Sequence, residues 1–362
     1  NNVASGSAAI EVITNRVFRD TNAWYHIVVA IDTTQSAIAD GVKLYVNGVR
    51  DTDFSGSPTY TQSATFEIGR NGSATAIGRY ESGSSQYFGG YIADVHYIDG
   101  QQKLPTDFGE TDSTTGIWKP KTYAGTYGNN GFLLEFKNSG ALGTDTSGNS
   151  ETFTVNGAGT NPQVTDTPSN NFVIMNRLAN YYPNSTFTKG NLSVAMGSSQ
   201  ATFNVGTFGV TKGKWYFEMK PTALGSGTDN CLVGIVSRPD STGTSDSLGD
   251  ATSVIYRNNG QSKKDGSNAT HGASWTTSNV VMVAIDADNN NVYFGTDGQW
   301  ANGSGNNNQA NPTSALAFTS TMVSDGIVFP AFGDLSTNSP EPGGKLNFGN
   351  PTFTISSGNA DA

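Results

Sequence analysis

Short runs rich in apolar residues, separated by polar turn residues, follow one another along the whole chain. In the first half they predict strands at residues 24–32, 41–48, 64–69, 90–98, 132–136 and 151–155. The strand at 24–32 is the expected hairpin partner of the second strand, which ends in Asn47-Gly48, a strong signal for a further hairpin to the next strand. Short strands separated by turn residues predict a β-sandwich or jelly roll.

The second half repeats this style of pattern. It predicts strands at residues 203–205, 213–220, 232–236, 280–286, 292–295, 328–332 and 345–349. A polar stretch rich in Gly, Asn and Thr lies between the halves and has the composition of a linker. We therefore expect an all-β fold with two antiparallel β-sandwich or jelly-roll domains in tandem. The expected domains are residues 1–160 and 181–362, joined by a linker at 161–180.

The composition supports this fold class and limits the partners. Only 14% of the residues are charged, while 44 are glycine and 19 are phenylalanine, which favours strands and turns over helices. Twenty Lys and Arg against thirty Asp and Glu give a net charge of −10, whereas nucleic-acid-binding proteins present basic surfaces. We therefore expect no nucleic-acid partner, and the apolar runs are too short for membrane insertion. Neutral glycans, anionic glycans bridged by a cation, and proteins remain as partners.

The single cysteine, Cys231, lies in an apolar segment and is expected in the core. One cysteine allows no intrachain disulfide and no multi-cysteine metal site. The chain begins at Asn1, with neither an initiator Met nor a signal-peptide pattern. We therefore expect it to be a segment of a longer protein, truncated at the N-terminus of its first domain.

The second half contains several motifs in an order typical of one family. They are, in order, Gly213-Lys-Trp-Tyr-Phe-Glu218, Val233-Gly-Ile235, Val283-Ala-Ile-Asp286, Val292-Tyr-Phe294, Asp297-Gly298, Phe329-Pro-Ala331 and Leu346-Asn-Phe-Gly349. On these motifs the second half resembles a SPRY domain. The resemblance implies a bent antiparallel β-sandwich that binds partners through its loops and has no catalytic activity.

The first half carries the motifs Trp24-Tyr-His-Ile-Val-Val-Ala30, Lys43-Leu-Tyr-Val-Asn-Gly48, Phe66-Glu-Ile-Gly69 and Phe88-Gly-Gly-Tyr-Ile-Ala-Asp94. On these it resembles a laminin-G-like jelly roll of the concanavalin-like type. Two departures matter. The early strands of the family are missing, and Asp94-Val-His96 stands where many members have Asp-Glu-Val-Arg. A cation site of the family therefore cannot be transferred to this chain.

The tandem arrangement, rich in Asn and Gly and poor in Cys, resembles tail-fibre or other virion surface proteins of marine bacteriophages. This resemblance implies a place on the virion surface, in a tail fibre or a capsid fibre. It also implies a homotrimer, contacts with other virion proteins, and recognition of a host cell-surface polysaccharide or protein.

The sequence gives no support for catalysis. Jelly-roll glycosidases usually present two carboxylates at alternate positions of one strand, and no predicted strand interior does so. Glu67, Glu135 and Glu218 each stand alone and are expected at solvent-facing strand positions. Asp94 and His96 could form a general-base pair or half of a metal site. A simple polar strand face is the favoured interpretation of that pair.

Metal binding rests on weaker patterns. Asp286-Ala-Asp288 and the segment Asp246–Asp250 offer clustered oxygen ligands for calcium. Tight turns use the same residue types to bond the backbone. We expect no cofactor, with calcium left open.

Aromatic residues in polar loops are the better signal for binding. Sugar rings stack on Trp and Tyr while their hydroxyl groups bond nearby amides and carboxylates. Tyr256 beside Asn258, Trp275, and Trp300 beside Asp297 have such surroundings, and these five are the expected ligand-binding residues. An equal alternative is that each aromatic residue caps the core.

The remaining tryptophans have structural interpretations. Trp24 and Trp215 begin apolar strands and are expected in the core, while Trp118 is expected to attach a connecting segment to the first sandwich.

Three functions remain. The first is a non-enzymatic adhesin whose weak loop contacts are multiplied by trimeric display. The alternative is a purely structural capsid or tail decoration protein without a host ligand. The third, a polysaccharide depolymerase, is disfavoured by the missing carboxylate pair.

Overall fold

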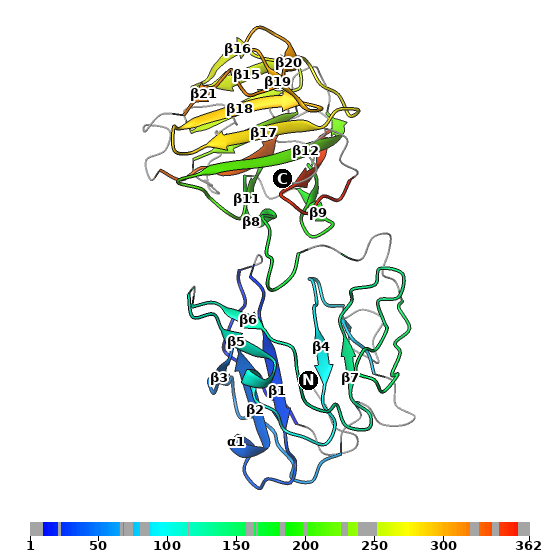
Figure 1. The fold of residues 1–362 in the computed structure, drawn as a ribbon. Coiled ribbons are helices and arrows are strands. Elements are labelled where there is room, and N and C mark those ends of the chain that lie inside the picture. The colour runs from blue at the N-terminus through cyan, green and yellow to red at the C-terminus, as the bar shows by residue number, and fades with distance from the viewer. Residues whose placement is uncertain are drawn as a thin grey trace. The chain divides into compact units, whose positions relative to one another are not determined.

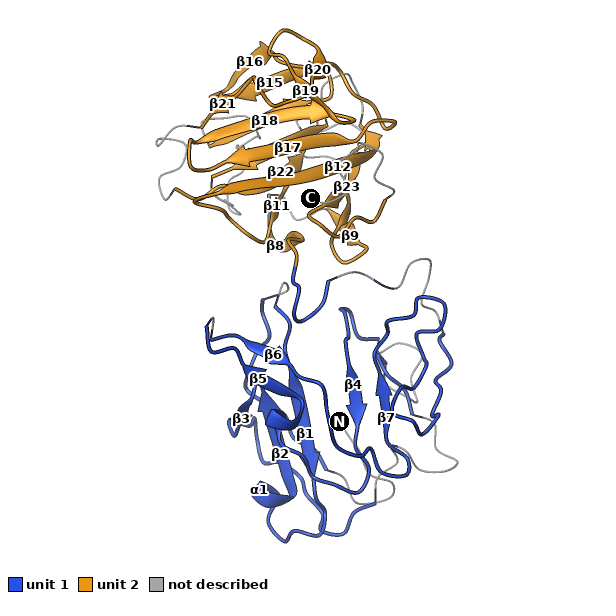
Figure 2. Ribbon diagram, viewed as in Figure 1, with its two compact units in different colours: residues 1–171 blue, residues 172–362 orange. Residues whose placement is uncertain are grey.

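The structure is a computed structural model that describes residues 10–20, 23–65, 68, 75–79, 87–114, 116–156, 163, 166–181, 185–197, 202–225, 231–237, 252–318, 326–334 and 340–353. The chain divides into two compact units, residues 1–171 and 172–362 (Figure 2). This boundary falls inside the stretch expected as a linker, 161–180. Part of that stretch is nevertheless ordered structure, because residues 175–181 form a strand of the second unit.

The first unit is built from small antiparallel sheets (Figure 1). One has the order β1-β2-β3, one pairs β4 with β7, and one pairs β5 with β6. The bounds are β1 (Ile27–Ile31), β2 (Val42–Val46), β3 (Val49–Asp51), β4 (Val95–Tyr97), β5 (Gly109–Thr111), β6 (Trp118–Pro120) and β7 (Phe132–Leu134), with α1 (Ile38–Gly41) and the 3-10 helix η1 (Pro105–Asp107).

The predicted hairpin is confirmed. β1 and β2 pair antiparallel, and β2 turns through Asn47-Gly48 into β3. Both turn residues have positive φ, 48° and 79°, as a two-residue hairpin turn requires. Gly48 also touches Trp118, since a Cβ at this position would lie 2.4 Å from the indole ring.

Elsewhere in this unit the predicted strands are shorter than expected. The segment 90–98 forms a strand only at β4, and 132–136 only at β7. Residues 151–155 form no strand. Residues 66, 67 and 69 of the expected strand 64–69, Glu67 among them, lie outside the described residues.

The second unit is a two-sheet sandwich. Nine strands form one sheet in the order β20-β19-β18-β17-β12-β23-β10-β9, with β21 paired to β18, and seven form the other in the order β16-β15-β14-β13-β22-β11-β8. The bounds are β8 (Met175–Tyr181), β9 (Thr186–Thr188), β10 (Ser193–Ala195), β11 (Phe203–Gly206), β12 (Lys214–Leu224), β13 (Leu232–Val236), β14 (Ser253–Arg257), β15 (Gln261–Lys264), β16 (Ser267–Thr270), β17 (Val281–Asp286), β18 (Asn291–Thr296), β19 (Gln299–Ala301), β20 (Asn307–Gln309), β21 (Leu316–Ala317), β22 (Phe329–Gly333) and β23 (Pro342–Asn347).

The core of the second unit lies between its two sheets. Alternate residues of β12 and β13 point inward, among them Phe217, Met219 and Val233. Phe332 from β22 packs with them, and Cys231 is fully buried at the same level, as predicted. The alternation therefore sets which face of each strand is buried. The predicted all-β, antiparallel fold class is confirmed, and this unit forms one of the two expected sandwiches.

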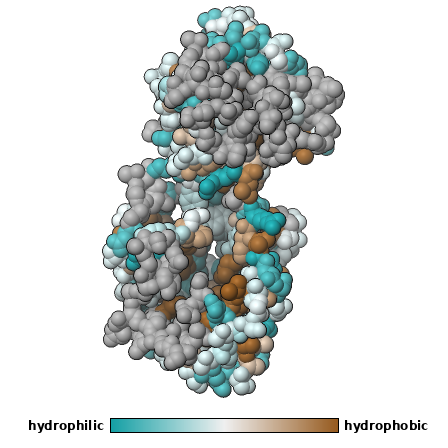
Figure 3. Space-filling view, turned by 180° about the vertical axis from the view of Figure 1, so that it is seen from behind, coloured by the Kyte–Doolittle hydropathy of each residue, from teal (hydrophilic) through white to brown (hydrophobic). Residues whose placement is uncertain are grey.

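Among the described residues, more of the exposed large apolar side chains belong to the first unit. Large apolar side chains at its surface include Ile27 and Val29 on β1 and Val49 on β3. Figure 3 shows brown, hydrophobic residues gathered on this unit.

Candidate functional site

Two expected ligand-binding aromatics lie in the core. Tyr256 is 0% exposed and Trp275 is 1% exposed. Tyr256 is an inward-facing residue of β14, its hydroxyl donates to the Ala273 carbonyl oxygen, and its ring stacks on Phe294 at 5.5 Å. Neither ring can stack on a sugar. The polar residues after Tyr256 suggested that it lies in a loop. Tyr256 instead lies near the end of the buried strand β14, and the polar residues come where that strand ends.

Asn258 is also structural. Its Oδ1 accepts the Cys231 N–H at 3.1 Å, and its own N–H donates to the Cys231 carbonyl at 3.1 Å. Its carbonyl accepts the Trp275 N–H at 2.9 Å. The buried amide thus satisfies the backbone where β13 begins and β14 ends.

Asp297 is exposed but shapes a turn. Its φ is 52°, and its Oδ1 accepts the Val280 N–H at 2.7 Å. Its Oδ2 accepts a hydrogen bond from the Asn279 amide. Both carboxylate oxygens therefore hold the turn between β18 and β19, next to Trp300.

Trp300 is the expected aromatic site residue that reaches the surface. It lies on β19, half-buried, between its cross-strand neighbours Gly295 and Gln309. Its indole contacts the Tyr216 ring edge-on, with ring centroids 6.2 Å apart. Trp300, Tyr216 and the half-buried Tyr293 point away from the core on the nine-stranded sheet, and we name these three the aromatic face.

Small residues shape the aromatic face. Tyr216, Ala284 and Tyr293 are successive cross-strand neighbours on β12, β17 and β18, which lie side by side in Figure 1. In the next row Gly295 separates Met282 from Trp300, and a Cβ there would meet the Met282 methyl at 2.8 Å. Ala284 and Gly295 thus leave room for the Trp300 and Tyr216 rings to lean together.

Glu218 orients one ring of this face. It was expected at a solvent-facing position, but it is 0% exposed. Its Oε1 accepts the Tyr216 hydroxyl at 2.7 Å and its Oε2 accepts the Asn347 amide at 3.0 Å. Burial is tolerated because both carboxylate oxygens are hydrogen-bonded. This network fixes Tyr216 and occupies the carboxylate.

Trp215 is an aromatic residue that lies at the surface although the sequence pattern predicted it in the core. It was expected in the core, yet it is 52% exposed. It is on the inward side of β12, opposite Ile285, but only one residue from the strand end, where the core closes. Its indole N–H donates to the Lys212 carbonyl at 2.7 Å, so the exposed ring is held in place. The preceding turn residue Gly213 was the available signal.

The Asp94–His96 pair forms no shared polar face. Asp94 has φ 47° and precedes β4, and burial raises the pKa of its carboxyl. His96 points into an aromatic cluster, with Nδ1 3.0 Å from the Tyr127 hydroxyl and its ring 5.1 Å from Phe108. Burial lowers the pKa of His96 to about 4.

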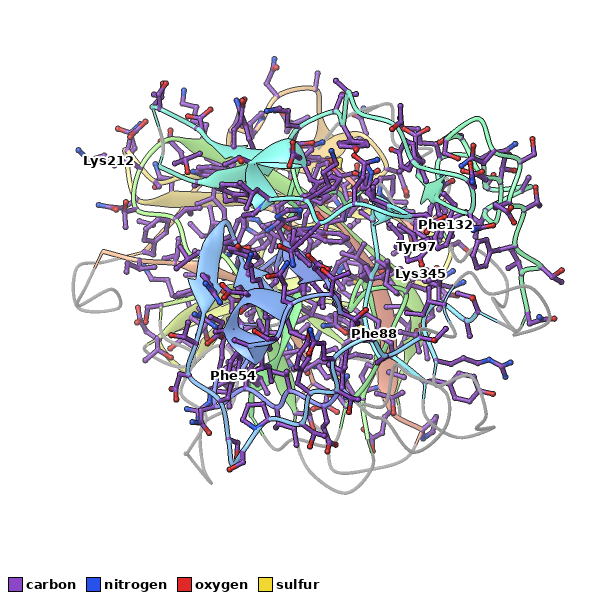
Figure 4. All side chains as sticks on the ribbon, turned by 90° about the horizontal axis from the view of Figure 1, so that it is seen from below. Phe54, Phe88, Tyr97, Phe132, Lys212 and Lys345 are labelled. Carbon is purple, nitrogen blue, oxygen red and sulfur yellow. The ribbon has the colours of Figure 1, made fainter. Side chains whose placement is uncertain are left out.

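The opposite side of β4 is aromatic as well. Tyr97 stacks on Phe132 of β7 at 5.4 Å, and Figure 4 shows the two rings close together. The two short strands are therefore held together by ring packing as well as by backbone hydrogen bonds.

Trp118 has the attaching role that the sequence predicted. Its indole N–H donates to His26 Nδ1 at 3.0 Å and the two rings stack at 5.7 Å. Trp24, expected in the core, is only half-buried. Glu135 is bonded to Lys137 and is not a lone carboxylate.

Of the calcium candidates, Asp286 and Asp288 lie in the described residues, and both hold turns through hydrogen bonds. Asp286 accepts two hydrogen bonds from Asn289, and Asp288 accepts the Gly213 N–H at 3.0 Å. The segment Asp246–Asp250 lies outside the described residues. Across the described part of the chain, no three His, Cys, Asp or Glu residues are grouped to hold a metal. In the same part, no helix has the length and apolar character needed to cross a membrane.

The comparison with families concerns the first unit. Residues 2–102 match the Concanavalin A-like lectin/glucanases superfamily, laminin-G type. This match confirms the laminin-G-like resemblance. Proteins of this fold often bind ligands. No curated protein sequence matches the chain.

Among solved structures, the SPRY domain of human HERC1 aligns with 50% of this chain and 99% of that chain, at 15% identity and a TM-score of 0.39. Stonustoxin aligns with 48% of this chain and 27% of that chain, at 14% identity and a TM-score of 0.34. The alignment thus spans about a quarter of the stonustoxin chain.

Proposed function

We propose that the protein is a non-enzymatic glycan-binding protein and that the aromatic face, Tyr216, Tyr293 and Trp300, receives the sugar. The observation that carries the proposal is the pair of contacting rings, Trp300 and Tyr216, on an outward sheet face. The apolar C–H side of a pyranose packs on such rings, while Gln309 beside Trp300 offers an amide for its hydroxyl groups.

Preorganisation supports this assignment. Glu218 fixes Tyr216 through a 2.7 Å hydrogen bond, and ring contact fixes Trp300. Rigid rings lose little conformational entropy on binding, so more of the contact energy appears as affinity. The net charge of −10 favours a neutral glycan over an anionic one. Trp215, exposed at the strand end, is a second stacking surface.

A binding role also suits the carboxylates. Glu218 accepts two hydrogen bonds and Glu135 bonds Lys137, so neither is placed as the free acid or nucleophile of a glycosidase. We propose that the chain is part of a bacteriophage virion fibre that displays the face in three copies to a host-surface polysaccharide. Three linked weak sites would give useful avidity.

The test is binding of the full chain to immobilised dextran, mannan and galactan, with Trp300→Ala and Tyr216→Phe beside the wild type. We expect Trp300→Ala to weaken binding at least about tenfold, a loss of about 1.4 kcal/mol. Tyr216→Phe keeps the ring but loses the hydrogen bond to Glu218, and should weaken binding less. The matched control is Phe208→Ala, which removes an aromatic ring 40% exposed elsewhere in the same unit and should bind normally.

The proposal fails if Trp300→Ala binds as tightly as the wild type, or if none of the neutral polysaccharides is retained. Light scattering tests the fibre arrangement separately, because a trimer is expected and a strict monomer would contradict threefold display by this chain.

A further inference from the structure

Two carboxyl groups lie buried together in the second unit. Asp334 follows β22 of the seven-stranded sheet, and Glu341 precedes β23 of the nine-stranded sheet. Their side chains are within hydrogen-bonding reach of each other. Asp334 is 1% exposed. The pair therefore lies between the end of β22 in one sheet and the start of β23 in the other.

The backbone holds Asp334 in place. Its N–H donates to the Thr202 carbonyl at 2.9 Å, and its Oδ1 accepts the Thr202 N–H. These two hydrogen bonds to Thr202, which precedes β11, leave Oδ2 for Glu341. Asp334 Oδ2 and both Glu341 oxygens are buried, and none has a hydrogen-bond donor among the described residues.

No positive charge balances the pair among the described residues. None of the ion pairs among the described residues includes Asp334 or Glu341. The neighbouring titratable group is the Cys231 thiol, whose own pKa is raised by burial and by Asp334, so it stays neutral. Arg257 is opposite Leu232 in the register and therefore on the other face of the sheet.

Two adjacent buried carboxylates cannot both be ionised at low cost. A hydrogen bond between them needs one proton, which makes one group the donor and the other the acceptor. We propose that Asp334 and Glu341 share a proton that joins the two sheets at this point, and that loss of this proton loosens the second unit. The second unit would therefore be more stable in mild acid than in mild alkali.

The direction of the pH effect follows from the pKa. Burial and the Glu341 carboxyl raise the pKa of Asp334 to about 8, whereas an unfolded chain has its ordinary value of 3.8. The folded state therefore binds more protons between these values. The stabilising contribution is complete below pH 3.8 and is lost as the pH rises through about 8. One extra bound proton changes the unfolding constant up to about tenfold per pH unit.

The experiment is urea unfolding of the full chain, followed by tryptophan fluorescence in EDTA at pH 6.5, 7.5 and 8.5. Asp334→Asn keeps a hydrogen-bond donor for Glu341 without a titrating proton. We expect the ratio of wild-type to Asp334→Asn unfolding constants to rise several-fold from pH 6.5 to 8.5. Glu341→Gln should remove the same pH dependence and serves if the first variant does not fold.

Asp288→Asn is the matched control, since this carboxylate only accepts the Gly213 N–H in a surface turn. It should keep the pH dependence of the wild type. Parallel pH curves for the wild type, Asp334→Asn and Glu341→Gln would overturn the proposal.

Discussion

The two units reach a buried core in different ways. The second unit packs a nine-stranded sheet on a seven-stranded sheet, with fully buried apolar residues such as Phe217 and Phe332 between them. The sheets described in the first unit have two or three strands, and half-buried rings such as His96 and Tyr127 lie between them. Long paired strands bury enough apolar surface to dominate the core of the second unit. Short strands need specific side-chain bonds as well.

The strongest way to break the second core is Phe217→Ala. Phe217 is 2% exposed and contacts Phe348, so truncation leaves a cavity between the sheets. We expect a loss of about 3–5 kcal/mol in the free energy of unfolding. Urea denaturation measures it. Phe208→Ala, at a 40% exposed ring, should cost well under 1 kcal/mol. Equal losses in the two variants would show that burial between the sheets is not what makes Phe217 stabilising.

The corresponding test in the first unit concerns a turn. Gly48→Ala puts a Cβ 2.4 Å from the Trp118 ring at φ 79°, so we expect a loss of about 2–3 kcal/mol. Gly56→Ala has a similar φ of 69° but open space around it. Its loss should be about 1 kcal/mol, from the backbone alone. Thermal unfolding of both variants separates the ring contact from the backbone strain.

The sequence pattern predicted strands best where a continuous apolar run corresponds to a buried, regularly paired strand. The segment 232–236 became β13 without change, and 280–286 became β17 except for its first residue. Polar strands such as β15 (Gln261–Lys264) had no apolar alternation to reveal them. In the first unit, residues 151–155 alternate but gain no strand partner.

The candidate site was only partly predictable. Polar flanking residues singled out Trp300, which does reach the surface, but the same argument failed for Tyr256, which belongs to a buried strand. Flanking polarity does not tell a loop from a strand end. The prediction for Trp215 was wrong in the opposite sense. An apolar strand begins there, but Trp215 lies at the strand end, beyond the buried core, and is exposed. Glu218 was misplaced because its partners, Tyr216 and Asn347, come together only in the folded sheet.

Acid sharpens the comparison between the units. Burial lowers the pKa of His96 in the first unit and of His271 in the second to about 4, from 6.5 in the unfolded chain. Each contribution is present above pH 6.5 and is lost as the pH falls toward 4. In the second unit Asp334 opposes this trend, because its stabilising effect is greatest in acid. The first unit should therefore lose more stability between pH 6.5 and 4.

Hydrogen exchange of β1 and β17 peptides, corrected for intrinsic rates, measures this difference. We expect a loss of about 2 kcal/mol in the first unit, after allowance for the partial exposure of His96. His96→Gln keeps a polar partner for the Tyr127 hydroxyl and should remove most of that loss. An acid loss that persists in His96→Gln would show that other groups cause it.

The smallest expected effect tests whether single side-chain bonds hold the first unit together. Trp118→Phe keeps a ring beside His26 but removes the indole N–H that donates to His26 Nδ1 at 3.0 Å. A half-buried hydrogen bond of this kind contributes about 1 kcal/mol, and the loss should appear in exchange at β1 and β6 but not in the second unit. His26→Gln supplies another acceptor for the same N–H and should lose less. If Trp118→Phe exchanges like the wild type, ring packing alone joins β6 to the residues before β1, and the contrast between the units narrows to the number of their strands.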